Sequence, residues 1–259
     1  MRQRLLLIDG LNLIRRLHAA LESEADATRR IERTQGLCVD AMAKLVQQFA
    51  PMYVAIVFDS PAKTWRHELF PEYKLGRAPM DDQLLEAMPD FAKLFRFNGW
   101  PCLRLNGWEA DDLVATLAYK ASEHGIQSMI VSTDKGYTQL LTEPNILQYD
   151  YFAKQGYDVE WVEQKYGVRV AQLPDYWALV GDTTNHIPGV KGVGPKLATQ
   201  VLAQADTLEQ VYADLSRYTP RLQNLLSGHL EHCLFARQMV TLRTDVDIGI
   251  RLSQLKQSV

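Results

Sequence analysis

The sequence predicts an α/β domain built on a parallel sheet, followed by an all-helical domain. Three short apolar runs rich in branched residues indicate buried strands, and they lie at 5–9, 53–59 and 128–134. Helical patterns separate these runs, and such alternation favours a mostly parallel sheet covered by helices on both faces. From about residue 160 the strand patterns fade and helical patterns take over. The predicted domains are therefore 1–160 and 161–259.

Weaker patterns complete both domains. Two further strands are expected at 101–105 and 145–150. The expected helices of the first domain cover 36–50, 82–99 and 109–125. Those of the second domain cover 172–181, 194–205, 207–215 and 221–242.

Composition limits the class of protein. The chain has 259 residues, 47% of them hydrophobic, and a net charge of -3, so it can bury a real core without a strong charge bias. Three widely spaced cysteines form no metal-binding pattern and indicate a reducing compartment. No stretch is long enough for a membrane span or a signal peptide. We therefore expect a cytoplasmic protein, and nothing in the sequence indicates more than a monomer.

Acidic residues follow the predicted strands. In open parallel sheets, ligands bind beyond the carboxyl ends of the strands, where loops from different strands meet. Carboxylates gathered there repel one another unless cations neutralise them, and oxygen ligands favour magnesium or manganese. The alternative is that each acid caps a helix, but repetition at three strand ends favours a metal site for hydrolysis of a phosphate ester. The predicted cluster consists of Asp9, Asp59, Glu109, Asp111, Asp112 and Asp134.

A glycine-rich turn separates two predicted helices of the second domain. Glycines at 189, 192 and 194 allow close backbone approach, and Pro195 suits the first position of a helix. The free amides of that helix, with Lys191 and Lys196 nearby, would bind a phosphate backbone without reading bases. The alternative is an ordinary helical hairpin.

The segment 63–82 fits neither domain class. It is long, basic and aromatic, and it leaves the sheet just after Asp59. Connections of this kind are usually functional or disordered, and a solvated surface loop is the alternative interpretation.

Six motifs in order resemble the 5′-nucleases of the flap endonuclease type, and the similarity covers most of the chain. They are "LLIDG" (6–10), "VFD" (57–59), "WRHELFPEYKLGR" (65–77), "EADD" (109–112), "STDKG" (132–136) and the "GD" to "PGVKGVGPK" stretch (181–196). The sequence is similar to the short bacterial members, which stand apart from the polymerase-linked 5′-nuclease. The resemblance implies a PIN-like α/β domain and a C-terminal helix–three-turn–helix domain. It also implies a structure-specific endonuclease that cuts branched DNA carrying a single-stranded 5′ flap, in replication and repair.

The resemblance assigns roles to individual positions. The carboxylates of Asp9, Asp59, Glu109, Asp111 and Asp112 match the first metal position, and those of Asp134 and Asp182 match part of the second. The turn at 179–196 matches a potassium site formed by the backbone carbonyls of Leu179, Val180, Pro188, Val190 and Val193. DNA phosphate contacts are implied for Gly192, Val193, Gly194, Pro195, Lys196 and Leu197.

The segment 63–82 matches the arch of this family, through or beneath which the 5′ end passes. Arg66, Lys74 and Arg77 would contact phosphates there. Trp65 and Tyr73 could stack on bases.

Two positions depart from the family pattern. Members with a full second metal site carry acids where this chain has Gly136 and Asn185. We therefore expect one magnesium held directly, with Asp111 the favoured ligand, and a second held through water, with manganese able to substitute. Fewer carboxylates attract the second metal ion less strongly, so weak nuclease activity is expected. The alternatives are a flap-binding protein without effective catalysis and a ribonuclease of the wider PIN class.

Overall fold

The computed structural model describes residues 3–257 and contains a six-stranded sheet with the order β3-β2-β1-β4-β5-β6. The five strands β1 to β5 run parallel, and β6 pairs with β5 in the antiparallel direction. This confirms the predicted mostly parallel sheet. The strands are β1 (Arg4–Asp9), β2 (Tyr53–Val57), β3 (Cys102–Leu103), β4 (Gln127–Val131), β5 (Ile146–Asp150) and β6 (Gln155–Tyr157).

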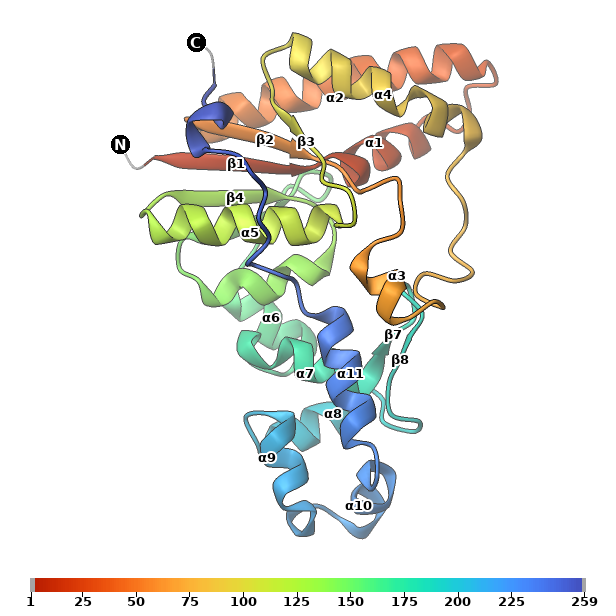
Figure 1. Cartoon of the computed structure of the whole chain (residues 1–259), viewed down its shortest axis with the longest axis vertical. Coiled ribbons are helices and arrows are strands. Elements are labelled where there is room, and N and C mark those ends of the chain that lie inside the picture. The colour runs from red at the N-terminus through yellow and green to blue at the C-terminus, as the bar shows by residue number, and fades with distance from the viewer. Residues whose placement is uncertain (1–2, 258–259) are drawn as a thin grey trace.

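Helices cover both faces of the sheet (Figure 1). Alternate side chains of β1 point to opposite faces: Leu6 and Ile8 enter one apolar cluster, and Leu5 and Leu7 enter another. The first cluster is completed by α1 (Gly10–Ala19), α2 (Ala27–Phe49) and α4 (Asp82–Phe97), and the second by α5 (Ala110–Glu123). Burial on both faces explains why β1 is a continuous apolar run.

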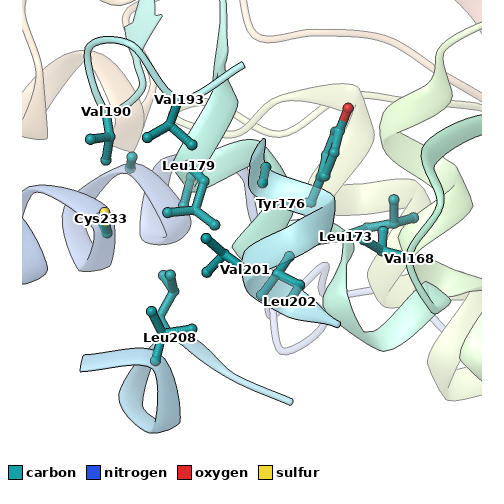
Figure 2. Close-up of a cluster of buried hydrophobic side chains, with 14 of the residues drawn as sticks. Val168, Leu173, Tyr176, Leu179, Val190, Val193, Val201, Leu202, Leu208 and Cys233 are labelled. Atoms are coloured by element: carbon teal, nitrogen blue, oxygen red, sulfur yellow. The ribbon is translucent and has the colours of Figure 1, made fainter. Parts of the chain in front are cut away.

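The helical part lies below the sheet in Figure 1 and has its own core. Its helices are α6 (Val159–Tyr166), α7 (Leu173–Val180), α8 (Pro195–Leu202), α9 (Leu208–Ala213), α10 (Pro220–Leu226) and α11 (Leu230–Val240). Figure 2 shows Leu179, Val201, Leu208 and Cys233 meeting in this core. A two-stranded hairpin, β7 (Gly181–Asp182) and β8 (Ile187–Pro188), follows α7.

Short elements connect the larger ones. Helix α3 (Trp65–Leu69) lies within the segment 63–82, and the rest of that segment runs along the outside of the molecule towards α4 (Figure 1). The 3-10 helices are η1 (Lys135–Thr142), η2 (Val170–Gln172), η3 (Leu215–Arg217) and η4 (Leu252–Leu255).

Some helix bounds differ from the sequence prediction. Helix α1 was not predicted, and α2 begins at Ala27 rather than 36 because Asp26 caps it by accepting a hydrogen bond from the Arg29 amide. The predicted helix at 221–242 is two helices, α10 and α11, since the chain turns at Gly228 with φ of +77°.

The chain returns to the sheet after α11. The C-terminal segment (241–257) packs Val246 and Leu255 into the apolar cluster that α5 shares with the sheet. Lys120 of α5 donates a hydrogen bond to the Val246 carbonyl at 3.1 Å, and Lys256 forms a β-bridge with Tyr53. No helix in residues 3–257 combines the length and apolar character that crossing a bilayer requires.

Candidate nuclease site

Four of the predicted carboxylates line one cavity beyond the carboxyl ends of the strands. Asp9 ends β1, Asp59 and Asp134 follow β2 and β4, and Asp111 lies in the first turn of α5. All four line a cavity of about 300 Å³, which we call the carboxylate cavity. The strand-end position therefore brings together side chains that are far apart in sequence.

A second cavity of about 420 Å³ adjoins the first and extends towards the helical part. The two cavities share Asp111, Thr133, Asp134, Thr184 and Asn185. The combined space therefore lies between the edge of the sheet and the β7–β8 hairpin.

The carboxylate cavity gathers negative charge that the protein itself does not fully neutralise. Burial, followed by the charges of Asp59 and Asp134, raises the pKa of Asp9 to about 7. Burial and the neighbouring carboxylates Asp134 and Asp9 raise the pKa of Asp111 well above its usual range. Burial also raises the pKa of Asp59. A bound cation would relieve this repulsion and favour the ionised forms.

Hydrogen bonds orient the carboxylates of the cavity. Asp9 accepts from the Asn12 amide and from Ser132 Oγ, both at 3.0 Å. Asp59 accepts from the Ala110 amide at 2.9 Å. Asp9 caps α1 and Asp134 caps η1, so the helix-cap interpretation holds for these two acids alongside their position in the cavity.

The other two acids of the "EADD" motif form a buried ion pair instead. Arg66 donates to Glu109 Oε2 at 2.6 Å and to both carboxylate oxygens of Asp112 at 2.7 and 2.9 Å. It also donates to the backbone carbonyls of Met239 and Thr241. Because Arg66 is only 2% exposed, the predicted phosphate contact of Arg66 is wrong.

The predicted metal role of Asp112 is contradicted, and that of Glu109 competes with protein contacts, although Glu109 lines the second cavity beside Asp111. Asp112 is fully buried and accepts from Trp65 Nε1 and the Arg243 amide as well as from Arg66. Glu109 accepts from Tyr73 and Lys74 in addition to Arg66. Although burial opposes its ionisation, Lys74 and Arg66 outweigh that effect and lower the pKa of Glu109. Protein cations therefore pair with both acids.

The predicted DNA-contacting residues of the segment 63–82 also fall into two groups, those held by buried contacts and those that line the carboxylate cavity. Tyr73 is 5% exposed and donates its hydroxyl proton to Glu109 at 3.0 Å, so the predicted base stacking is wrong for this ring. The indole of Trp65 is held by Asp112 and covered by the Arg66 guanidinium, which opposes a stacking role. Lys74 and Arg77 line the carboxylate cavity.

The second-site residue Asp182 organises the hairpin. Its carboxylate accepts from the Thr184 and Asn185 amides and from Asn185 Nδ2, the last at 2.6 Å. Asn185 therefore adds no charge to the cavity but holds Asp182 in the cavity wall. Gly136 lies beside Asp134, to which its amide donates a hydrogen bond.

Two family models match almost the whole chain. Residues 4–167 match the N-terminal resolvase-like domain of the 5′–3′ exonucleases, and residues 168–259 match their C-terminal SAM fold. The chain belongs to the 5′–3′ exonuclease family. The matched regions meet at 167 and 168, whereas the domains predicted from the sequence meet at 160 and 161.

Curated relatives refine the family assignment of this nuclease. It is 41% identical over 257 residues to flap endonuclease Xni of Photorhabdus laumondii, with 98% of each chain covered. It is 44% identical to flap endonuclease Xni of Pectobacterium carotovorum, covering 98% of this chain and 95% of the relative. The predicted resemblance to short bacterial flap endonucleases is confirmed.

Solved structures agree with the fold of this nuclease. A crystal structure of T5 D15 protein with metal ions has a TM-score of 0.79 at 21% identity, covering 93% of this chain and 90% of that one. The catalytic core of Rad2 with DNA substrate has a TM-score of 0.52 at 17% identity, covering 92% and 70%. The predicted combination of α/β and helical parts is therefore confirmed.

The glycine turn of the nuclease is built on close backbone contact. A Cβ on Gly189 would lie 2.3 Å from the Val180 carbonyl carbon and 2.4 Å from the Gly181 nitrogen. The Val190 amide donates to the Leu179 carbonyl at 2.9 Å. Only glycine fits at 189, so the turn stays folded against the end of α7.

Sequence reasoning missed several residues around the nuclease site. Tyr137 donates to Asp111 at 2.7 Å, and Ser132 orients Asp9. Both lie in residues 132–137, which begin with the "STDKG" motif, so their closeness to Asp134 in the sequence was the available signal. Arg15 and Arg16 line the carboxylate cavity from α1, and their only signal was a basic pair two turns after Asp9.

Proposed function

We propose that this nuclease is a structure-specific 5′ flap endonuclease that hydrolyses DNA near the flap junction with magnesium. The observation that carries the proposal is the carboxylate cavity, which is lined by four acids together with Arg15, Arg16, Lys74 and Arg77. The acids suit metal binding, and the cations suit DNA phosphates.

The donor set fits magnesium. No three acidic, histidine or cysteine side chains within residues 3–257 converge into a ready-made metal cage. Magnesium keeps several waters and usually takes only one or two carboxylates, so an open set of acids suits it. Asp111 would bind directly, and Asp9, Asp59, Asp134 and Asp182 would bind through water or support a second ion, with manganese able to substitute. When bound, the metal would polarise the phosphate and lower the pKa of a water.

The protein groups would position the DNA around that metal. Lys74 and Arg77 would hold the phosphate beside the carboxylate cavity, with Lys74 fixed by its contact to Glu109. Tyr137 would keep Asp111 aimed at the metal, since its hydroxyl already donates to that carboxylate.

The glycine turn would bind the duplex. The N-terminus of α8 has no side-chain cap. Pro195 has no amide proton and the Leu197 amide donates to the Gly194 carbonyl at 3.0 Å, so the Lys196 amide is the one offered to a phosphate. The contacts would come from Gly192, Val193, Gly194, Pro195, Lys196 and Leu197. A potassium ion would be bound by the backbone carbonyls of Leu179, Val180, Pro188, Val190 and Val193. This site predicts tighter DNA binding in a potassium salt than in the salt of a large organic cation at equal ionic strength. Equal affinity in both salts would exclude this site.

One cleavage and binding experiment tests the function. A labelled 5′-flap DNA is incubated with magnesium and potassium, with chelator, and with the variant Asp111→Ala. Cuts near the junction that need metal and vanish in Asp111→Ala are expected. Asp40→Ala, which removes an exposed acid on α2, is the matched control and should leave cleavage unchanged.

A second candidate function is flap binding without effective catalysis, and Gly136 and Asn185 are the observation that favours it. Tight binding without cutting, over a wide range of magnesium and manganese concentrations, would support that alternative.

A parallel experiment with an RNA flap tests the ribonuclease alternative, which requires RNA to be cut better than DNA. Gel filtration and cell fractionation test the proposed monomeric state and cytoplasmic location.

A further inference from the structure

A groove outside the proposed machinery opens beside the carboxylate cavity. It has a volume of about 680 Å³ and lies between α4 and the carboxyl ends of β2 and β3. We call it the α4 groove. Leu11 and Asp59 line both the α4 groove and the carboxylate cavity, so the two spaces adjoin. The groove is therefore next to the point where a chain would leave the carboxylate cavity.

The lining of the α4 groove is mainly apolar. Phe58, Met80, Met88 and Leu103 contribute apolar surface, and Leu85 is 56% exposed. Contiguous apolar surface with a polar rim, unlike a single exposed side chain, is typical of a binding site. Methionine side chains are flexible and polarisable, so they adapt to flat partners of different shape.

The rim of the α4 groove is cationic. Lys93, Arg96 and Arg104 line it. Lys93 is paired with Asp90 at 2.8 Å, but within residues 3–257 neither Arg96 nor Arg104 forms an ion pair with a carboxylate. Apart from Asp59 at the shared opening, no acid within the described residues lines the groove. The groove therefore complements a polyanion that also carries apolar faces.

We propose that the α4 groove holds the first nucleotides of the single-stranded 5′ flap as they leave the carboxylate cavity. This inference rests on the proposed function and adds the path of the flap. Base faces would lie on the methionine and leucine surface, and Arg96 and Arg104 would contact phosphates. Contacts of this kind tolerate any base, which suits an enzyme that recognises a branch and not a sequence.

The test compares binding of two flap DNAs with identical duplexes, one with a single-nucleotide flap and one with a flap of about ten nucleotides. Affinity is measured by fluorescence anisotropy in chelator, so that no cleavage occurs. The variants are Arg96→Ala/Arg104→Ala and Leu85→Ser. Lys44→Ala, which removes an exposed charge on α2 that does not line the groove, is the control.

Wild-type protein is expected to bind the long flap more tightly than the short one. Arg96→Ala/Arg104→Ala should weaken long-flap binding about tenfold and Leu85→Ser about threefold, with short-flap binding unchanged. An unchanged preference for the long flap in both variants would overturn the inference, as would equal weakening of both DNAs. Because binding is measured without metal, a protein that showed this pattern but cut neither DNA would refute the nuclease proposal and leave the groove assignment standing.

Discussion

Arg66→Ala removes a buried guanidinium that holds three parts of the molecule together. Arg66 lies on α3, its two carboxylate partners are Glu109 and Asp112 of the "EADD" motif, and its carbonyl partners lie at the end of α11. Without Arg66, both carboxylates stay buried with less neutralising charge. Removing one partner of a buried ion pair costs about 3–5 kcal/mol.

The remaining contacts place the expected loss at the lower end of that range. Glu109 keeps Lys74 and Tyr73, and Asp112 keeps two donors. A loss of about 3 kcal/mol corresponds to a melting temperature about 10 °C lower for a chain of this size. Thermal unfolding followed by circular dichroism measures it directly.

Three further variants sharpen the test. Arg66→Lys keeps the charge but loses the two-pronged geometry, so an intermediate loss of stability is expected. Arg66→Met combined with Asp112→Asn should lose less than Arg66→Ala, because less buried charge is left unpaired. Arg77→Ala, at an exposed position, should weaken DNA binding without lowering the melting temperature. If Arg66→Ala had the same melting temperature as the wild-type protein yet bound DNA poorly, the phosphate-contact role would be right and the structural role refuted.

The remaining predictions concern charge and the glycine positions. Since the pKa of Asp9 is raised to about 7, the metal-free folded protein holds more protons than the unfolded chain between about pH 4 and 7. Its melting temperature in chelator should therefore fall as pH rises through that window, and less so in Asp9→Asn. Gly189→Ala, which forces a backbone clash, should lower the melting temperature and abolish any potassium dependence of DNA binding, whereas Gly194→Ala meets open space and should melt normally. Gly136→Asp with Asn185→Asp should lower the magnesium concentration needed for half-maximal cleavage severalfold, and an unchanged metal titration would contradict the reduced second site.

The fold was predictable where the hydrophobic pattern was strong. The run from Leu5 to Ile8 is buried on both faces, and its unbroken apolar character alone indicates a central parallel strand. The first turns of α2 escaped prediction because Arg29, Arg30 and Arg33 interrupt its apolar stripe. Its start depends on a cap at Asp26, a signal too common to be decisive alone.

The site was predictable to the extent that strand ends determine it. Asp9, Asp59 and Asp134 met as expected because parallel strands end at one edge. The direction of a side chain is not visible in sequence spacing, so nothing indicated that Arg66 would turn inwards to a partner 43 residues away. Its basic character suggested DNA equally well, and only burial distinguishes the two roles.

The return of the C-terminal segment to the sheet changes how the helical part is connected. With Val246 and Leu255 packed into the apolar cluster of α5 and the sheet, the region from α6 to α11 is an insertion within the sheet domain, covalently tied at both ends. Any tilt of that insertion over bound DNA must bend the chain at two crossings together, one before α6 and one after α11. A protein shortened to the first family region would also expose the apolar surface that the last residues cover, so the two regions are not separable folding units.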